Sequence, residues 1–416
     1  MRAVYSNILL KAARFPQGRE NRCSPRRTRR ISRPVLREKV VQEPFNILIA
    51  GGGTGGHLFP GIAIAESFMD KNPDNRVLFV LTGNPFEKKV LSEKRYSYET
   101  VSASGIKGMT ALKKLKSISL LPVGIFESRQ IIKRFKPDLA VGMGSYSAGP
   151  VLLAAWLSGV NIVLHEQNIM PGVTNRLLSG FAKRVYVSFR HTDIGMNKSK
   201  IRYTGNPVRR NILDALTMNK ATDGKSVTPR FTILVLGGSQ GAHSINTAVC
   251  DALPLLKHPE DFLFIHQTGQ RDESLVKDTY SRLAVDNRVQ SFFDDMGSLY
   301  KQADLIICRA GATTVAEVTA MGKCTIFIPY PYAADDHQVK NALSVTGANA
   351  AEVILESNLN GRLLAERIDA LSSDPAKRRA MADNSRSVGK PEAAEAIIND
   401  CYELLLKGNK KEVQYT

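Results

Sequence analysis

A glycine-rich segment that ends at a histidine is the first stretch of the chain whose residue types suit chemistry. Residues 51–56 read Gly-Gly-Gly-Thr-Gly-Gly, and His57 follows them directly. An apolar run at 46–50 precedes the glycines, and Pro60 suits the first turn of a helix after them. Glycines allow a sharp turn and the close approach of a ligand, and a helix N-terminus attracts anions. We therefore predict a site for phosphate or another oxyanion at this loop.

The same glycines satisfy the dinucleotide fingerprint G-x-G-x-x-G through Gly51, Gly53 and Gly56. That fingerprint also needs an acidic residue at the end of the second strand, where it holds a ribose. The chain has Leu-Thr-Gly-Asn-Pro at 81–85 instead. A nicotinamide or flavin site is therefore disfavoured, although a dinucleotide-dependent oxidoreductase stays a minor alternative.

Apolar runs of strand length alternate with amphipathic stretches from residue 45 onward, which is typical of β-α-β units around parallel sheets. A second strand and glycine loop, at 231–236 and 237–241, begin about 185 residues after the first. Two such openings predict an α/β fold of two Rossmann-like domains that face each other across a cleft. The expected strands are 46–50, 76–81, 139–142, 161–165, 184–188, 231–236, 262–267, 289–293, 305–308 and 325–328.

Breaker-rich and charged stretches indicate where the chain divides. Residues 222–229 are polar and rich in helix breakers, which is typical of a linker or loop. The expected parts are a basic extension at 1–44, an N-terminal domain at 45–208, a linker region at 209–230, a C-terminal domain at 231–390, and a helix and tail at 391–416.

The composition restricts the class of protein. A chain of 416 residues with 43% hydrophobic residues suits two globular domains. No run of about 18 uncharged apolar residues occurs, so no membrane-spanning helix is expected. The five cysteines are scattered without a C-x-x-C pair, which suits a reducing compartment and argues against a zinc site.

Half of the formal net charge of +18 lies at the start of the chain. Residues 1–44 hold twelve Lys and Arg against three Glu, with little apolar periodicity, so we expect them to lack fixed structure. Their Arg and Ser content resembles an organelle transit peptide, and a start assigned too far upstream would look the same. No aromatic residues interleave with the arginine cluster, which disfavours a nucleic-acid arm, and we expect no nucleic-acid partner.

Six motifs together resemble the MurG family of peptidoglycan glycosyltransferases, in order and in spacing. The resemblance runs from about Asn46 to Leu405 and implies the glycosyltransferase B fold, with the acceptor held by the N-terminal domain and the donor by the C-terminal domain. It implies inverting transfer of N-acetylglucosamine from UDP-N-acetylglucosamine to the muramoyl 4-hydroxyl of lipid I, giving lipid II and UDP. Another lipid-directed enzyme of this fold, such as a diacylglycerol glucosyltransferase, is the alternative. The motifs lie at 52–57, 142–150, 165–168, 205–209, 237–242 and 308–317.

The resemblance also implies roles for single residues. Glu317 would hold the ribose hydroxyls of the donor, although an exposed Glu in the first turn of a helix is also favoured by the helix dipole alone. Gln338 would contact the sugar, while His337 stands where the family more often has Gln and is left without a role. The donor-binding residues implied are Thr54, Gly55, Gly56, Asn168, Arg209, Ser239, Phe293, Ala312, Thr313, Thr314, Val315, Ala316, Glu317 and Gln338.

The catalytic base stays open at this point. An imidazole titrates near neutral pH, so His57 is a plausible base for the acceptor hydroxyl, although it could instead cap the helix or hydrogen-bond the lipid diphosphate. Glu166 and Asn168 are close rivals, because they follow the strand at 161–165 and lie at the same sheet edge. The acceptor-binding residues implied are His57, Tyr146 and Asn168.

No metal or other cofactor is expected. The chain has Asp-Asp pairs at 294–295 and 335–336 but no Asp-x-Asp, the motif that holds a metal on the diphosphate in many related transferases. Helix N-termini with Ser239, Thr314 and Arg209 would then meet the charge of the leaving diphosphate.

A lysine-rich stretch at 105–121 carries no acidic residue and aligns with the membrane-docking patch of the family. An amphipathic core helix with a solvated lysine face is the alternative. We expect a peripheral protein on the cytoplasmic face of the plasma membrane, with UDP-N-acetylglucosamine, lipid I and an anionic membrane surface as partners, and with other cell-wall synthesis or division proteins as further candidates. The expected membrane residues are Lys107, Met109, Leu112, Lys113, Lys114, Leu115, Lys116 and Ile118.

Overall fold

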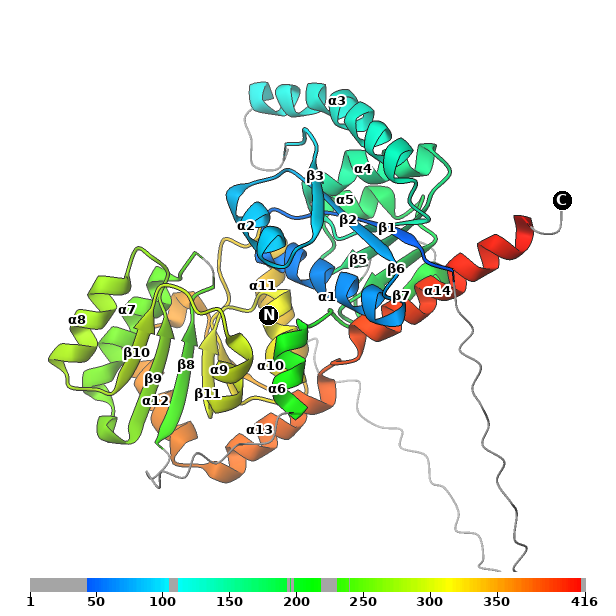
Figure 1. Ribbon diagram of the computed structural model, residues 1–416. Helices are drawn as coiled ribbons and strands as arrows, with labels where there is room; N and C mark the ends of the chain where they lie inside the picture. Colours follow the sequence, from blue (N-terminus) through cyan, green and yellow to red (C-terminus); the bar gives the residue numbers. More distant parts are fainter. Residues whose placement is uncertain are drawn as a thin grey trace, which may run out of the picture. The chain divides into compact units, whose positions relative to one another are not determined.

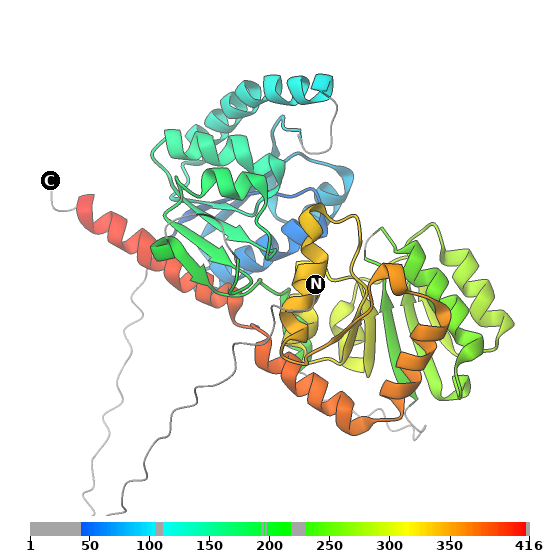
Figure 2. The same ribbon diagram turned by 180° about the vertical axis from the view of Figure 1, so that it is seen from behind.

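The computed structural model describes residues 43–104, 111–192, 195, 198–217, 230–238 and 240–412, of which 111–119, 334 and 408–412 are described by their backbone alone. Two parallel β-sheets with flanking helices make up this part of the chain (Figures 1 and 2). The α/β class expected from the alternating sequence pattern is therefore confirmed. The extension expected at 1–44 lies outside the described residues, except for Glu43 and Pro44.

The first sheet consists of seven parallel strands: β1 (Asn46–Ala50), β2 (Arg76–Leu81), β3 (Ser97–Thr100), β4 (Leu139–Gly142), β5 (Asn161–Glu166), β6 (Arg184–Val187) and β7 (Ile201–Tyr203). Their order is β3-β2-β1-β4-β5-β6-β7. Ile47, Leu48 and Ile49 of β1 are fully buried, because the central strand is covered on both faces. The strand order reverses between β1 and β4, and open α/β sheets bind ligands in the crevice at the carboxyl ends of the strands beside such a reversal.

Five helices accompany the first sheet, and the first of them begins directly after the glycine loop. They are α1 (Gly55–Lys71), α2 (Pro85–Glu93), α3 (Ala111–Phe135), α4 (Ser145–Leu157) and α5 (Val173–Leu178).

The second sheet repeats this plan with six parallel strands: β8 (Phe231–Leu236), β9 (Phe262–Gln267), β10 (Asn287–Gln290), β11 (Leu305–Cys308), β12 (Thr325–Phe327) and β13 (Glu352–Val353). Their order is β10-β9-β8-β11-β12-β13, so a second crevice opens between β8 and β11. The accompanying helices are α7 (His243–Ala252), α8 (Glu273–Arg282), α9 (Met296–Gln302), α10 (Ala312–Ala320), α11 (His337–Thr346), α12 (Gly361–Ser372) and α13 (Pro375–Val388).

The ten strands expected from the sequence are all present, and three further strands appear. β3, β7 and β13 are short and only half-buried, so they lack the apolar run that marked the others. The strand expected at 289–293 ends earlier, because β10 covers Asn287–Gln290.

Two helices connect the two halves of the chain, which are the half that forms the first sheet and the half that forms the second. α6 (Arg210–Thr217) follows the first sheet in sequence but packs against α9 of the second half, where a Cβ at Gly297 would clash with the Asn211 carbonyl. α14 (Ala393–Glu412) follows the second sheet, yet Ile397, Ile398 and Tyr402 belong to the core around β1. The chain therefore crosses between the halves twice.

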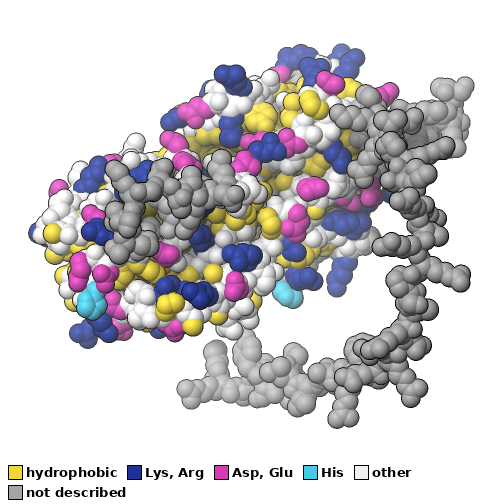
Figure 3. All heavy atoms as spheres, turned by 60° about the horizontal axis from the view of Figure 1, so that its bottom comes forward, with side chains coloured by type: hydrophobic (Ala, Val, Ile, Leu, Met, Phe, Trp, Pro, Cys, Tyr) yellow, Lys and Arg dark blue, Asp and Glu magenta, His cyan; other side chains and the backbone are white. Residues whose placement is uncertain are grey.

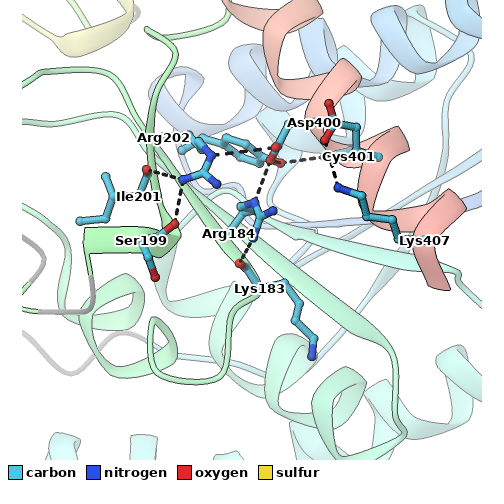
Figure 4. A network of polar contacts seen from close by, with 10 residues as sticks. Lys183, Arg184, Ser199, Ile201, Arg202, Asp400, Cys401 and Lys407 are labelled. Carbon is cyan, nitrogen blue, oxygen red and sulfur yellow. Dashed lines mark hydrogen bonds and ion pairs between the residues drawn. The ribbon is translucent and has the colours of Figure 1, made fainter.

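Polar contacts also fix α14 to the first sheet (Figure 4). The Tyr186 hydroxyl donates to Asp400 Oδ2 at 2.8 Å, and Arg184 Nε lies 3.2 Å from the same oxygen. Arg202 approaches the other carboxylate oxygen of Asp400 at 4.0 Å. One carboxylate on α14 thus holds three side chains from β6 and β7.

On the face drawn in Figure 3, Lys and Arg side chains are interspersed with Asp and Glu. Among the helices of the described residues, none is both long and apolar enough to cross a bilayer.

Candidate active site

Two glycine-containing loops meet at the crevice of the first sheet. Gly51 has a φ of +126°, and a Cβ there would lie 2.6 Å from the Gly144 carbonyl oxygen. Gly144 has a φ of +81°, and a Cβ there would lie 3.5 Å from His57 Nε2. The positive φ favours glycine at both positions, and at Gly51 a side chain would also clash with the neighbouring loop. The loops after β1 and β4 therefore close against each other, with the His57 ring beside them.

A buried carboxylate that the motif search missed holds the first of these loops. Glu87 is fully buried on α2, and its Oε1 accepts a hydrogen bond from the Gly53 N–H. Its Oε2 accepts from the N–H groups of Gly83 at 2.8 Å and Asn84 at 2.9 Å. The Asn84 side chain also donates to the Gly53 carbonyl at 3.2 Å. A Cβ at Gly52 would clash with the same carboxylate.

This arrangement limits the N–H groups that the first glycine loop can offer to the predicted oxyanion. The N–H of Gly53 is occupied by Glu87, and that of Gly51 bonds the Val80 carbonyl. Gly55 and Gly56 open α1, where the helix itself offers no partner for the first N–H groups. The predicted oxyanion site is therefore restricted to the start of α1.

The environment of His57 keeps its imidazole neutral. Burial, together with the nearby His337, lowers the pKa of His57 to about 4. Thr54 Oγ1 lies 3.5 Å from His57 Nδ1. A neutral imidazole can accept a proton at physiological pH. His337, left without a role by the sequence, is the first residue of α11 and lies near enough to His57 to act on its pKa.

Glu166 is buried and organises its own loop. Its Oε1 accepts from the Asn168 N–H at 3.0 Å, and its Oε2 accepts from the Gly172 N–H at 3.0 Å and from Asn175 Nδ2 at 2.8 Å. Burial raises the pKa of Glu166, although these hydrogen bonds oppose the shift. Both oxygens are thus engaged within the loop that follows β5, so the position suits loop support, and a catalytic role for Glu166 stays a prediction.

Glu317 of α10 is the centre of a buried polar cluster. Its Oε1 accepts from Arg209 Nε at 2.9 Å, and its Oε2 accepts from the Tyr300 hydroxyl at 2.9 Å. Burial pushes the pKa of Arg209 down, but the Glu317 carboxylate outweighs burial and raises it. The Arg209 guanidinium also lies 4.6 Å from the centre of the Phe59 ring of α1. The exposed Glu considered as an alternative is therefore wrong, because Glu317 is 3% exposed.

Direct hydrogen bonds connect the loops of the first sheet to helices α10 and α11 of the second half. Thr313 Oγ1 on α10 donates to the Gly56 carbonyl at 3.2 Å. Asn341 on α11 bridges the same halves, because its Nδ2 donates to Asn168 Oδ1 at 3.2 Å and its Oδ1 accepts from the Ile169 N–H at 3.1 Å. Residues expected to bind donor and acceptor therefore lie around one space.

Comparison with known proteins agrees with this geometry. Residues 47–187 match the glycosyltransferase family 28 N-terminal domain, and residues 232–397 match the family 28 C-terminal domain. A Geotalea uraniireducens protein named UDP-N-acetylglucosamine--N-acetylmuramyl-(pentapeptide) pyrophosphoryl-undecaprenol N-acetylglucosamine transferase is 45% identical over 357 residues, which cover 86% of this chain and 97% of that protein. A Myxococcus xanthus protein of the same name is 41% identical, covering 87% and 94%. The crystal structure of Acinetobacter baumannii MurG has a TM-score of 0.68 at 30% identity, covering 88% of this chain and 100% of that one.

The chain belongs to the MurG family. The resemblance and the glycosyltransferase B fold expected from the motifs are therefore confirmed.

In this MurG-family chain, the remaining donor candidates lie at the carboxyl ends of the second sheet. Gln338 Oε1 accepts from the Tyr330 N–H at 3.0 Å, which leaves the amide NH₂ group to donate. Asp335 and Asp336, just before α11, have positive φ values of 57° and 53°. Such strained backbone is common at binding sites.

Gln267 is a second residue that the motif search missed. Its Oε1 accepts from the Phe293 N–H at 3.1 Å, and its Nε2 donates to the Gly238 carbonyl at 3.1 Å. The N–H of Phe293, one of the predicted donor-binding residues, is therefore already engaged. Ser239, expected at the diphosphate, lies outside the described residues.

The remaining predicted donor-binding, acceptor-binding and membrane residues lie away from these contacts or outside the described residues. Tyr146 is 43% exposed in the first turn of α4. Ala312, Val315 and Ala316 line a cavity on a different face of α10 from Thr313 and Glu317. Lys107 and Met109 lie outside the described residues, and the side chains of Leu112, Lys113, Lys114, Leu115, Lys116 and Ile118 are not described. Among the described residues, no cluster of three or more His, Cys, Asp or Glu could hold a metal ion.

Two buried histidines of the MurG-family fold predict a loss of stability in mild acid. Burial lowers the pKa of His165 to about 4 and that of His266 to about 3, from an ordinary value of 6.5. The unfolded chain therefore binds more protons below pH 6.5, and the free energy of unfolding falls as the pH drops from about 7 to about 5. Each histidine should contribute about 2 kcal/mol to this loss.

Urea unfolding at the two pH values measures the effect. In His266→Gln the difference in the free energy of unfolding between about pH 7 and about pH 5 should shrink by about 2 kcal/mol. His258→Gln, in which a 70% exposed side chain is changed, should leave it unaltered. An unchanged pH dependence in His266→Gln would contradict the buried neutral state.

Proposed function

We propose that this protein transfers N-acetylglucosamine from UDP-N-acetylglucosamine to the muramoyl 4-hydroxyl of lipid I, giving lipid II and UDP. The observation that carries the proposal is the hydrogen bond from Thr313 to the Gly56 carbonyl, one residue before His57. It sets the N-terminus of α10 against the first glycine loop. The names of the two relatives from Geotalea uraniireducens and Myxococcus xanthus give the same donor and acceptor.

The donor diphosphate is assigned to the N-terminus of α10. The first N–H groups of this helix, at Ala312, Thr313 and Thr314, have no partner within the helix and face an anion favourably. Arg209, held beside them by Glu317, supplies a permanent positive charge. Each oxygen of Glu317 accepts one hydrogen bond in this structure and has a second lone pair for a ribose hydroxyl.

The chemical step is an inverting displacement. The acceptor hydroxyl oxygen attacks the anomeric carbon while the bond from that carbon to the diphosphate oxygen breaks, and UDP leaves with the electron pair. The hydroxyl proton passes to the neutral His57 imidazole, which is thus the general base. The low pKa of His57 makes it a weak base in this state, and an acceptor diphosphate next to the ring would raise that pKa.

Transfer without a metal ion is part of the proposal. The helix N-terminus and Arg209 already place positive charge where the leaving diphosphate gains negative charge. Radiolabelled UDP-N-acetylglucosamine is incubated with a lipid I analogue or with diacylglycerol, each in the presence of EDTA. We expect label only in the lipid I product and no effect of the chelator. Label in diacylglycerol would support the alternative lipid-directed transferase, and loss of activity with EDTA would contradict the metal-free step.

We also propose that the protein docks peripherally on the cytoplasmic face of the plasma membrane, where the acceptor lipid lies. Several large apolar side chains of α3, α4, α5 and the segment after α5 are exposed. The Trp156 and Phe181 rings pack on each other, with centroids 4.5 Å apart, but both remain exposed. The exposed set comprises Leu121, Val123, Phe126, Trp156, Leu157, Val173, Leu177 and Phe181.

Reversing the lysine charges should weaken this docking. Each Lys near an anionic surface contributes on the order of 1 kcal/mol, and salt screens the effect. We expect the variant Lys107→Glu, Lys113→Glu, Lys114→Glu, Lys116→Glu to sediment poorly with anionic liposomes at low salt but to turn over a short-chain soluble acceptor normally.

The comparison uses chains that lack residues 1–44, so that the charge of the extension does not mask the result. A matched variant with Lys88, Lys89, Arg362 and Arg379 changed to Glu should keep its liposome binding. Equal binding by both variants would place the docking face elsewhere.

A further inference from the structure

A cavity of about 350 Å³ lies where the chain crosses between its two halves. It is lined by Asn206, from the crossing after β7, and by Lys390, from the return crossing between α13 and α14. Arg190, after β6, and Ala316 of α10 complete its sides. We call this cavity the crossover pocket. It adjoins the proposed donor site without coinciding with it: Ala312 and Ala316 of α10 line the cavity, whereas Thr313 and Glu317 do not.

The mouth of the crossover pocket is positively charged. The Arg190 guanidinium lies 5.0 Å and Lys390 Nζ 5.8 Å from the centre of the same Tyr203 ring. His191 lies next to Arg190 and also lines the cavity. Among the described residues, no carboxylate lines the pocket and none forms an ion pair with Arg190. Lys390 approaches Glu392 at 3.7 Å, outside the lining. Two cationic side chains in a lining without a carboxylate favour an anionic ligand.

One buried side-chain oxygen in the lining of the crossover pocket has no hydrogen-bond donor. Asn206 is 3% exposed, and its Nδ2 donates to Thr313 Oγ1 at 3.4 Å. Its Oδ1 is buried and has no hydrogen-bond partner among the described residues. Buried acceptors are nearly always paired, so this oxygen indicates a missing donor such as a hydroxyl or an amide N–H.

We propose that the crossover pocket binds a small organic anion that also carries a hydroxyl or amide group. Its phosphate or carboxylate lies between Arg190, His191 and Lys390, and its donor group reaches Asn206 Oδ1. The volume falls in the range of small-molecule sites. Because the ligand contacts both crossings, it holds the two halves in the arrangement described here. Through Asn206 and Thr313, its occupancy is linked to the Gly56 carbonyl in the candidate active site.

Isothermal titration with sn-glycerol 3-phosphate and with inorganic phosphate tests the proposal. UDP is present at saturation, so that the proposed diphosphate site is filled. We expect saturable binding of one glycerol 3-phosphate per chain, and weaker binding of inorganic phosphate, which lacks the carbon-bound hydroxyls. Arg190→Ala with Lys390→Ala should weaken glycerol 3-phosphate at least tenfold, because two charge-assisted contacts are lost. Arg362→Ala with Arg379→Ala removes the same charge from exposed positions and should leave binding unchanged.

A further variant, Asn206→Ala, should abolish the preference for glycerol 3-phosphate over inorganic phosphate, with folding checked by thermal unfolding. The proposal is overturned if neither probe binds saturably, or if the exposed control pair weakens binding as much as the pocket pair. If UDP itself does not bind, that result contradicts the proposed donor and not the proposal about the crossover pocket. The comparison of the two double variants, repeated without UDP, then still decides whether the pocket is the site.

Discussion

Replacing His57 with Ala is expected to lower kcat by about 10²–10⁴-fold, the range for loss of a general base. The neutral ring, with its pKa lowered to about 4, can accept the proton of the acceptor hydroxyl. The affinity for UDP should stay at the wild-type value, because the proposed nucleotide contacts come from α10 and Arg209. Steady-state kinetics with varied acceptor, together with titration of UDP, separates these quantities.

His258→Ala is the matched control, since that histidine is exposed and far from both glycine loops in sequence. It should keep kcat within about twofold of wild type, as surface substitutions usually do. If His57→Ala raises only the acceptor KM, then His57 binds the acceptor and another group takes the proton.

The strands were predictable because each has a local signal. In a doubly wound parallel sheet the central strands are buried on both faces, so β1 and β8 appear in the sequence as unbroken apolar runs before glycines. β7 and β13 have three and two residues and are only partly buried, which leaves no run to detect. The packing of α14 against the first sheet could not be predicted either, because the apolar face of a helix does not show which hydrophobic core it packs against.

The candidate site was predictable only as a set of loops. Motif order placed His57 and Thr313 at strand ends, but their proximity depends on how the two halves meet, and no local pattern encodes that. Asn84-Pro-Phe-Glu87 has the spacing of a capping box, which the structure contains. That spacing could have marked Glu87 as the start of a helix, although not as the group that holds Gly53.

Glu166 shows a second limit of the sequence. Its place after a buried strand, at the crevice edge, made it a rival for the catalytic base. The structure instead surrounds its carboxylate with donors from Asn168, Gly172 and Asn175. A sequence shows that a carboxylate lies at a strand end, but it does not show whether neighbouring N–H groups saturate it.

Replacing Glu87 with Ala is the second substitution for which we expect a large effect. The change removes a buried carboxylate that accepts from the N–H groups of Gly53, Gly83 and Asn84, so three partly buried donors lose their partner. The free energy of unfolding should fall by on the order of 3 kcal/mol or more. The loop that carries His57 should also shift, and a displacement of about 1 Å near the reacting groups costs roughly 10²-fold in rate.

Because Glu87 touches no substrate, a merely destabilised protein must be distinguished from a displaced loop. Activity is therefore measured at a temperature where circular dichroism shows Glu87→Ala to be folded. Under those conditions we expect kcat to fall while UDP binds as in the wild type, since the donor contacts lie on α10. Glu93→Ala, on the same helix with a side chain that is 62% exposed, should change neither quantity. A folded Glu87→Ala enzyme with normal kcat would mean that the other contacts of the loop, at Gly51 and Gly144, position His57 without the carboxylate.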